Sequence, residues 1–445
     1  MVRAFIPFVF FAMARSSESN APPIAAAEKT SSDKRTADAS LHNAAMIADG
    51  FNTTRRLFIT EKKLSTLELL VLPSDAEHTL RVWGEAETGV LKVRVLSPDG
   101  EAILSWQGRR GEKTVERALA AGKYTVEIDA RTAQGALAVI GVKGPVVSQC
   151  PVDAARMLEH EAKPAKGFGW PYLVYVPTNV RAANALVVPN NTGFNTDDLV
   201  VLRAQGACEI ASYAKTAEAL GVVTIVPLFP RPAANGGESN LYLHALTRSA
   251  LATKEVAFKR VDLQLLAMLD DARSMFATRG IEISEKVLLA GFSASGSFVN
   301  RFALLHPERV RAVASGSPGG WPTVPVSSDG QDALPYPIGI ADLQALVGKP
   351  LDSKALKTVS WLFFMGDQDR NDAVVYRDSF SKTDEALIFR RFGPTPLSRW
   401  DHAQRLYASQ KLDAQFKLYP GVAHNVTPDM VRDIEAFFAN AMIEK

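Results

Sequence analysis

Two different patterns of apolar and polar residues divide the chain into an earlier and a later part. Between residues 51 and 144, apolar positions alternate with polar ones in short runs, as at 90–96 before the turn Ser-Pro-Asp-Gly at 97–100. Alternation of this kind, interrupted by turns, is typical of strands that bury one face. It predicts an all-β sandwich at 51–144, with strands at 67–72, 79–83, 90–96, 102–106, 121–128 and 136–142.

After residue 144 the pattern changes to continuous apolar runs that alternate with segments of helical periodicity. Alternating strands and helices indicate a mostly parallel sheet with helices on both faces, so we expect one α/β domain at 145–445. Its clearest helix is 261–276, where apolar residues recur every three or four positions. The other expected helices are 209–220 and 428–442, and the expected strands are 172–177, 185–189, 222–227, 287–290, 310–314, 359–365 and 414–419.

The later part is organised around residues 286–307. An apolar run (287–290) leads into Gly-Phe-Ser-Ala-Ser-Gly at 291–296, and apolar residues at helical spacing follow. A strand, a tight turn carrying a serine and then a helix predict a nucleophile elbow, which lifts the hydroxyl of Ser293 out of the sheet. The usual pattern is Gly-x-Ser-x-Gly, but here Ser295 stands at the last position. An ordinary Gly-Ser turn is the alternative interpretation.

A nucleophilic serine needs a base and an acid, which follow it in the order acid, then histidine, in this type of fold. His424 lies in a loop between the last predicted strand and the last predicted helix, so it is the candidate base. The acid should follow a strand, and the run 361–365 leads into a loop with three aspartates. Spacing from Gly366 favours Asp369, Asp372 is the runner-up, and Asp367 is expected to bond loop amides.

An oxyanion hole needs backbone N–H groups directed at the developing negative charge. The N–H of Ala294, the residue after the nucleophile, is one expected donor. The second should come from the loop after an early strand, which here reads Pro-Asn-Asn-Thr-Gly at 189–193. Asn191 and Thr192 are the candidates, although the His-Gly pair that is common in such loops is missing.

Several motifs together resemble those of bacterial secreted α/β-hydrolases of the esterase and polyhydroxyalkanoate-depolymerase type. The motifs are Pro-Asn-Asn-Thr-Gly, Gly-Phe-Ser-Ala-Ser-Gly, Leu-His-Pro-Glu-Arg-Val, Gly-Ser-Pro-Gly-Gly-Trp-Pro and Tyr-Pro-Gly-Val-Ala-His, and they lie within 171–445. The resemblance implies an α/β-hydrolase fold and an ester or polyester substrate. The run Ala-Gly-Lys-Tyr-Thr-Val-Glu-Ile at 121–128 resembles the last strands of jelly-roll or immunoglobulin-like modules attached to secreted hydrolases.

Two insertions after predicted strands carry aromatic residues that could line a substrate pocket. Trp321 and Tyr336 lie in the insertion at 319–357, and Tyr242 lies in the one at 230–255. Aromatic side chains near strand ends favour an apolar acyl pocket. The alternative is that they only pack the insertions against the domain. In the sandwich, Trp83 and Trp106 are candidate stacking residues for a polymer, with a buried core role as the alternative.

The charge balance of the chain serves only to exclude some classes of partner. The 445 residues include 50 basic and 48 acidic side chains, a formal net charge of +2. Nothing in this balance indicates nucleic acid or an anionic membrane as a partner. The chain has no His-Glu-x-x-His, P-loop or dinucleotide-binding pattern, so we expect neither a metal nor an organic cofactor.

The start of the chain predicts export. A basic residue at position 3, an apolar run at 4–14 and an Ala-x-Ala end fit a signal peptide at 1–14, followed by a polar linker at 15–50. The apolar run is too short to span a bilayer, so no membrane insertion is expected. A mis-chosen start codon or a disordered apolar tail is the alternative. Export, to the periplasm or the medium, would allow the two cysteines, Cys150 and Cys208, to form a disulfide; otherwise they are free thiols.

These observations together predict a serine hydrolase that cleaves carboxylic esters, polymeric ones included, through Ser293, Asp369 and His424. The same triad also cleaves amides, so a serine peptidase or amidase of this fold is a second hypothesis. A non-catalytic polymer-binding protein is the third, and the complete set of triad candidates argues against it.

Overall fold

The computed structural model describes residues 53–59, 64–71, 77–119, 122–134, 136–143, 150, 153–191, 197, 199–232, 241–376 and 379–443. The expected signal peptide (1–14) and linker (15–50) lie outside these residues. So does Thr192, one of the two candidates for the second oxyanion donor.

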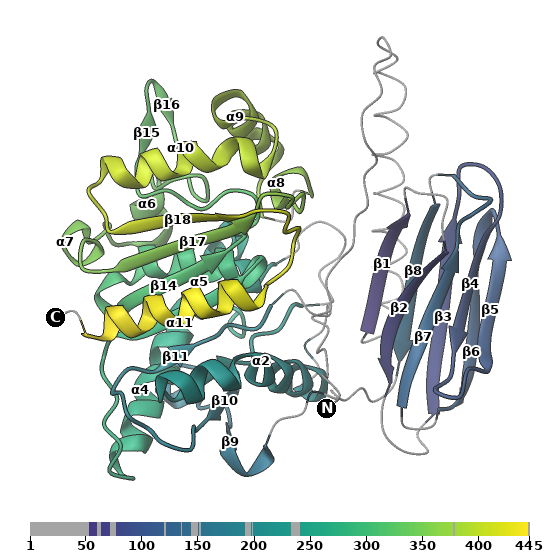
Figure 1. Cartoon of the computed structure of the whole chain (residues 1–445), viewed down its shortest axis with the longest axis horizontal. Coiled ribbons are helices and arrows are strands. Elements are labelled where there is room, and N and C mark those ends of the chain that lie inside the picture. The colour runs from purple at the N-terminus through teal and green to yellow at the C-terminus, as the bar shows by residue number, and fades with distance from the viewer. Residues whose placement is uncertain are drawn as a thin grey trace.

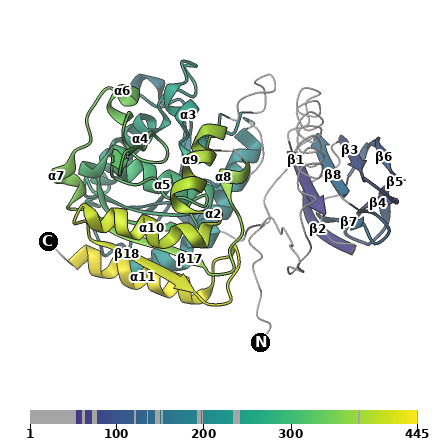
Figure 2. The ribbon, with the colours of Figure 1, turned by 90° about the horizontal axis from the view of Figure 1, so that it is seen from above.

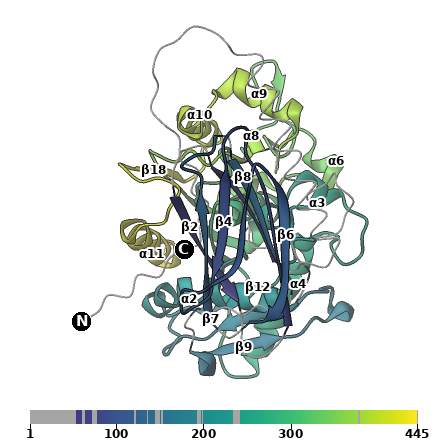
Figure 3. The ribbon, with the colours of Figure 1, turned by 90° about the vertical axis from the view of Figure 1, so that its right-hand side faces the viewer.

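The earlier part of the chain forms two four-stranded antiparallel sheets. One sheet has the order β1-β8-β3-β6 and the other β2-β7-β4-β5. Figure 2 shows them as two layers, and Figure 3 views the same strands from the side. The strands are β1 (Thr53–Ile59), β2 (Leu64–Val71), β3 (Glu77–Glu85), β4 (Leu91–Leu96), β5 (Ala102–Gly108), β6 (Arg110–Ala118), β7 (Gly122–Asp129) and β8 (Ala136–Lys143).

This strand order is that of a jelly roll, in which two sheets share one core. Leu80 and Ile140 from the first sheet and Val93 and Val126 from the second belong to a single buried cluster. The sequence pattern missed two strands. In β6 most side chains are exposed, so it has no apolar alternation to detect, and β1 was taken as the start of the domain without a strand of its own.

Trp83 and Trp106 take different positions in the jelly roll. Trp83 lies on the face of β3 opposite to the shared core, yet it is only 2% exposed, so it is not available to stack on a polymer. Trp106 is partly buried and packs against the core. A Cβ atom on Gly84 would lie 2.4 Å from the indole of Trp106, so this glycine makes room for the ring.

The later part of the chain contains one eight-stranded sheet with helices on both faces (Figure 1). Its order is β18-β17-β14-β13-β11-β12-β10-β9, and only β10 runs antiparallel to its two neighbours. The strands are β9 (Met157–His160), β10 (Tyr172–Tyr175), β11 (Leu186–Val187), β12 (Thr224–Pro227), β13 (Val287–Phe292), β14 (Val310–Gly316), β17 (Ser360–Gly366) and β18 (Ala414–Tyr419).

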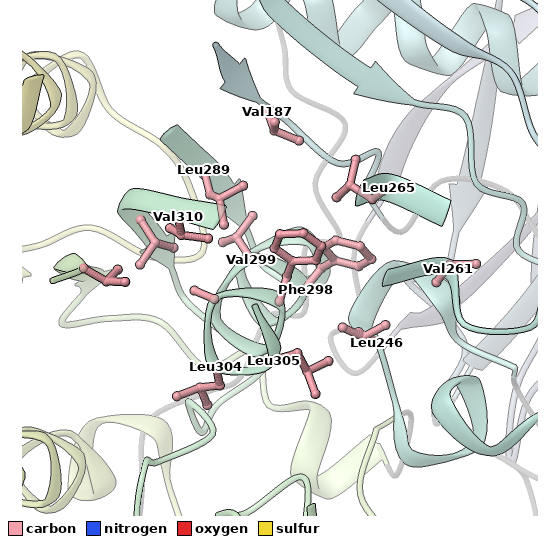
Figure 4. Close-up of a cluster of buried hydrophobic side chains, with 14 of the residues drawn as sticks. Val187, Leu246, Val261, Leu265, Leu289, Phe298, Val299, Leu304, Leu305 and Val310 are labelled. Atoms are coloured by element: carbon pink, nitrogen blue, oxygen red, sulfur yellow. The ribbon is translucent and has the colours of Figure 1, made fainter. Parts of the chain in front are cut away.

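The sheet separates two hydrophobic clusters. Helices α2 (Leu199–Leu220) and α11 (Pro428–Ile443) pack on one face, against side chains such as Leu288 and Ala290 of β13. Helices α4 (Val261–Ala277), α5 (Ala294–Leu305) and α10 (Pro396–Ser409) pack on the other, against side chains such as Leu289. Figure 4 shows Phe298 and Val299 of α5 within this second cluster, next to Leu289.

Shorter elements fill the connections. They are the 3₁₀ helices η1 (Ala154–Arg156), η2 (Pro164–Lys166), η3 (Leu243–Ala245) and η4 (Pro307–Arg309), the helices α3 (Arg248–Ala252), α6 (Leu343–Val347), α7 (Ser353–Leu356), α8 (Ala373–Tyr376) and α9 (Lys382–Phe392), and the hairpin β15 (Ser328–Asp329) with β16 (Asp332–Ala333). The sequence pattern missed α9 and α10 and began the helix before β12 at residue 209, although α2 starts at Leu199.

A disulfide joins Cys150, in the segment that enters the large sheet, to Cys208 on α2. It closes a loop across 58 positions of sequence. In the chain-entropy account, a disulfide that closes a loop of that length restricts the unfolded chain and so stabilises the folded state by about 4 kcal/mol. The expected pairing of the two cysteines is therefore present.

Counted along the chain, the eight strands of the large sheet lie in the order 1-2-4-3-5-6-7-8, with a serine in a tight turn directly after the fifth. This arrangement is the α/β-hydrolase fold, and it confirms the predicted fold class. Within the described ranges, no helix has the length and apolar character needed to cross a bilayer.

Candidate active site

The elbow serine occupies a strained backbone position between β13 and α5. Ser293 has φ 61° and ψ −120°, a conformation that non-glycine residues adopt rarely and at a cost of roughly 1–3 kcal/mol. Its backbone N–H donates to the carbonyl of Gly316 on β14 at 2.9 Å, which ties the turn to the next strand. The strain is maintained because a buried strand and a buried helix fix the chain on either side.

Small residues permit this turn, and the serine at the unusual position closes it. A Cβ atom on Gly291 would lie 2.3 Å from the carbonyl oxygen of Ser295, so no larger residue fits there. The Ser295 hydroxyl accepts from the N–H of Phe292 at 3.0 Å and donates to its carbonyl at 2.9 Å. The departure from Gly-x-Ser-x-Gly therefore adds two hydrogen bonds across the turn.

The candidate base and acid are directly bonded to each other. His424 Nδ1 donates to Asp369 Oδ2 at 2.8 Å, and the side chains are 10% and 1% exposed. The second carboxylate oxygen of Asp369 accepts from the backbone N–H of Asn371 at 2.8 Å. The imidazole of His424 also lies against the ring of Phe292, with centroids 4.7 Å apart, and Phe292 directly precedes Ser293.

The sheet order brings these residues to one edge. Ser293, Asp369 and His424 follow β13, β17 and β18, which run parallel, so all three lie beyond the carboxyl ends of strands. The loops that carry the acid and the histidine are close: a Cβ atom on Gly366 would lie 2.0 Å from the carbonyl oxygen of Val422. A glycine at the end of β17 is therefore required for the histidine loop to approach.

The other two aspartates of the acid loop have different partners. Asp367 Oδ1 accepts from the N–H of Gly421 at 2.8 Å, in the manner expected of a residue that bonds loop amides. Asp372 Oδ1 accepts from Arg399 Nη1 at 2.9 Å, and both side chains are buried. Burial raises the pKa of Asp372, while the hydrogen bond from Arg399 lowers it. Of the three, Asp369 is the one bonded to His424.

A second histidine–aspartate pair shows that such a bond alone does not identify a site. His306 Nε2 lies 2.8 Å from Asp262 Oδ2, and both side chains are fully buried. Burial acts to raise the pKa of Asp262, but the hydrogen bonds from His306 and Arg260 outweigh it and hold that pKa at about 2. Lys349 Nζ reaches His306 Nδ1 at 3.2 Å, so both ring nitrogens are used in linking helix ends.

On the oxyanion side, the structure describes one of the two expected second donors. The N–H of Asn191 is directed at Glu209 Oε1, 3.3 Å away, and its side-chain amide donates to the carbonyl of Phe292 at 2.9 Å. Asn191 thus braces the elbow and uses its N–H elsewhere. Ala294 is the first residue of α5, so its N–H has no acceptor within the helix.

Glu209, which the sequence analysis did not single out, is a carboxyl group beneath this loop. Burial raises the pKa of Glu209 to about 7, and the hydrogen bond from the N–H of Asn191 acts in the opposite direction. No motif pointed to it, because its contact with the N–H of Asn191 joins residues that lie 18 positions apart in the sequence. It titrates in the same pH range as an ordinary histidine.

Two of the three aromatic residues expected to line a pocket are in the core instead. Trp321 is 0% exposed, stacks on Phe392 and donates from Nε1 to the carbonyl of Ile338 at 2.9 Å. Tyr336 is 1% exposed and donates to the carbonyl of Leu246. Both rings therefore pack the insertions against the domain. Burial is tolerated because the polar atom of each ring donates to a backbone carbonyl. Tyr242 is also buried, at 4% exposed, but it packs against Ala294 beside the elbow.

One further side chain reaches the histidine. Asn371 Nδ2 lies 2.8 Å from His424 Nε2, the ring nitrogen opposite to the one that bonds Asp369. The only sequence signal was its place in the acid loop, two residues after Asp369. Within the part of the chain that the structure covers, no group of three or more His, Cys, Asp or Glu side chains is arranged to hold a metal ion.

Comparisons with known proteins give distant structural likeness. No protein-family model matches the chain, and no curated protein matches it. Poly(aspartic acid) hydrolase-1 from Sphingomonas sp. KT-1 is 16% identical, with a TM-score of 0.41 over 62% of this chain and 96% of its own. An arylesterase is 12% identical (TM-score 0.38; 67% and 87%), and a Pyrobaculum calidifontis esterase is 15% identical (TM-score 0.37; 66% and 86%). Likeness this distant says nothing about substrate.

Proposed function

We propose that this chain is a serine hydrolase that cleaves carboxylic esters, with Ser293 as nucleophile, His424 as base and Asp369 as the orienting acid. One observation carries the proposal: a buried carboxylate is bonded to a histidine at 2.8 Å, and that histidine packs on the residue before a strained elbow serine. Among the described residues, the partners that bond the buried pair of His306 and Asp262 include Lys349 and Arg260 but no serine.

The residues divide the acyl-transfer reaction between them. Asp369 accepts from Nδ1 of His424, so the neutral imidazole presents the lone pair of Nε2. Nε2 takes the proton of the Ser293 hydroxyl while the hydroxyl oxygen attacks the ester carbonyl. Asp369 stabilises the imidazolium that forms. His424 then returns the proton to the leaving alcohol. Water repeats these steps on the acyl-enzyme and releases the acid.

The negative charge on the carbonyl oxygen requires donors that are already in place. In this proposal the N–H of Ala294, at the start of α5, is one donor. The N–H of Thr192 is the second, because the N–H of Asn191 is directed at Glu209. Asn191 contributes indirectly, through the hydrogen bond from its side chain to the carbonyl of Phe292.

The test is hydrolysis of p-nitrophenyl esters from acetate to palmitate by the wild type and by Ser293→Ala. We expect kcat to fall by on the order of 10⁴ or more in the variant, because the nucleophile is lost. Ser274→Ala is the matched control, since this serine lies on α4 and its hydroxyl donates to the carbonyl of Asp270 at 2.8 Å. Near-normal turnover by Ser293→Ala would remove the whole assignment, and the chain-length optimum would size the acyl pocket.

Ester and amide cleavage are separated by adding a p-nitroanilide to the same series. Cleavage of the anilide without preference for esters would favour a peptidase or amidase. A polymer-binding role for the jelly roll is the weaker alternative, because Trp83 is buried and Trp106 packs against the core. A polyester substrate is tested by release of soluble acid from a polyhydroxyalkanoate suspension.

We also propose that the protein is exported. The disulfide between Cys150 and Cys208 supports this, since such bonds persist in oxidising compartments. The expected signal peptide predicts a mature chain that begins near residue 15. N-terminal sequencing of protein from the periplasm or medium tests the cleavage, and a thiol count on denatured, unreduced protein tests the disulfide. An uncleaved N-terminus together with two free thiols would contradict export.

A further inference from the structure

Asn371 bonds both partners of the candidate acid–base pair. Its backbone N–H donates to Asp369 Oδ1 at 2.8 Å, and its side-chain Nδ2 lies 2.8 Å from His424 Nε2. With the 2.8 Å bond between His424 Nδ1 and Asp369 Oδ2, the three residues form a closed ring of hydrogen bonds. The ring leaves neither nitrogen of the imidazole without a partner.

The direction of each hydrogen bond follows from the groups involved. An ionised carboxylate only accepts, so His424 Nδ1 carries the proton that Asp369 receives. In a neutral imidazole the other nitrogen, Nε2, is then an acceptor. The amide nitrogen of Asn371 can only donate. It therefore occupies the lone pair that the hydroxyl of Ser293 would need in order to lose its proton.

The structure of the loop does not require this side-chain contact. The turn is already held by the hydrogen bond from the N–H of Asp369 to the carbonyl of Gly366, at 3.1 Å. The buried pair of Asp372 and Arg399 fixes its far end. The backbone N–H of Asn371 satisfies the second oxygen of Asp369. The amide of Asn371 thus acts on the histidine rather than on the fold of the loop.

We propose that Asn371 is a positioning residue whose amide occupies Nε2 of His424, so that the Ser293 hydroxyl must displace the amide before it reacts. This inference rests on the proposed function, because it assumes that His424 is the base for Ser293. A donor at Nε2 disfavours protonation of that nitrogen. Removing this donor should therefore favour protonation of the ring and, at the same time, free its lone pair for the serine.

Other charged groups near the histidine must be separated from this effect. Asp369 faces Nδ1, and Asp367 bonds the N–H of Gly421 in the histidine loop. Asp372 is paired with Arg399 behind the acid loop. Glu209 lies beneath Asn191, which bonds the carbonyl of Phe292, and its pKa of about 7 could itself shape a pH profile.

The experiment measures the rate at which a fluorophosphonate labels Ser293 between pH 5 and 9, in the full-length chain. Labelling reports the reactivity of the serine directly and needs no knowledge of the substrate. In Asn371→Ala we expect the acid limb of the rate profile to move up by roughly half to one pH unit, and the plateau rate to rise about threefold to tenfold. The backbone N–H to Asp369 remains in this variant.

Asn371→Asp should act in the opposite direction on the rate. A carboxylate facing Nε2 favours the protonated ring, so labelling at pH 7 should fall at least about tenfold below the wild type. Asn425→Ala is the matched control, an exposed asparagine one residue after His424, and its profile should follow the wild type. All variants are repeated in a Glu209→Gln background, where a shift caused by Asn371 persists.

The possible results distinguish a failure of the role of Asn371 from a failure of the proposed function. An acid limb that stays in place in Asn371→Ala, or a plateau rate below that of the wild type, overturns the role of Asn371 while the serine mechanism stands. A shift that vanishes in the Glu209→Gln background also overturns it. A wild-type protein that is not labelled at Ser293 at all overturns the proposed function, and this inference with it.

Discussion

The jelly roll and the large sheet bury their strands in different ways. In β4 of the jelly roll, buried and exposed side chains alternate, because one face packs on the core and the other is open. In β13 of the large sheet all six residues are buried, because helices cover both faces. A strand without an exposed face has no place for polar chemistry along its length, so the polar residues gather at its end.

The two regions also treat charge differently. The jelly roll pairs Arg94 with Glu127 across neighbouring strands, on an exposed face. The α/β region takes charged groups inside, as in the pair of Asp372 with Arg399 and the buried carboxylate of Asp262, which Arg260 bonds. Burial makes such pairs costly to break, whereas exposed pairs contribute little. Substitutions of paired charged residues should therefore change the free energy of unfolding much more in the α/β region than in the jelly roll.

The largest expected difference concerns the two acids Asp369 and Asp99. Asp369→Asn should lower kcat for a p-nitrophenyl ester about 10³- to 10⁴-fold, because the histidine loses the partner that sets its tautomer. Asp99→Asn, in a turn of the jelly roll, should leave kcat unchanged. Steady-state kinetics at pH 7 measure both. If Asp372→Asn abolished activity and Asp369→Asn did not, the acid would be Asp372.

The buried ion pair comes next. Arg399→Met should lower the free energy of unfolding by about 3–5 kcal/mol, because Asp372 would remain buried without its partner. Urea unfolding followed by tryptophan fluorescence measures the change. The double variant Arg399→Met/Asp372→Leu should recover part of the loss, since it removes the unpaired carboxyl. A change below about 1 kcal/mol in the single variant would contradict the contrast between the regions.

Glu209 makes stability depend on pH. Burial raises its pKa from 4.5 to about 7 in the folded protein. Between these values the unfolded chain has lost the proton and the folded protein still holds it, so wild-type stability falls as pH rises and then levels off above 7. Glu209→Gln lacks this dependence, and its free energy of unfolding relative to the wild type should rise by about 3 kcal/mol from pH 4.5 to 7.

Urea unfolding of both proteins at several pH values measures that difference. Asn191 keeps an acceptor in Glu209→Gln, because the amide oxygen can replace the carboxylate. Two unfolding curves that differ by a constant amount over this pH range would show that Glu209 has an ordinary pKa.

The smallest effect is expected at the exposed pair. Arg94→Met should change the free energy of unfolding by less than about 1 kcal/mol at physiological salt, because the arginine side chain is 54% exposed and water screens the pair. Calorimetry of the wild type and the variant measures it. A loss as large as that from Arg399→Met would mean that exposure does not separate the two regions.

Local sequence patterns were sufficient to predict the fold class of both regions and most of the candidate site residues. The period of apolar residues distinguished the all-β part from the α/β part, since alternation and continuous runs reflect how many faces a strand buries. The turn of small residues around Ser293 and the order of acid and histidine along the chain pointed to residues that the fold places at one edge. Strand β6 escaped detection because nearly all of its side chains are exposed.

Only the tertiary structure decided which polar groups meet. Spacing favoured Asp369 and kept Asp372 as the runner-up. In the structure, α10 places Arg399 beside Asp372, and the loop after β18 places His424 beside Asp369. Trp321 and Tyr336 lie in the core, because aromatic composition does not reveal on which side of an insertion a ring is buried. The contacts of Asn371 with His424 and of Glu209 with Asn191 likewise join separate segments of the chain. Local sequence specifies the elements, but contacts between distant elements, and the burial they create, assign roles to individual side chains.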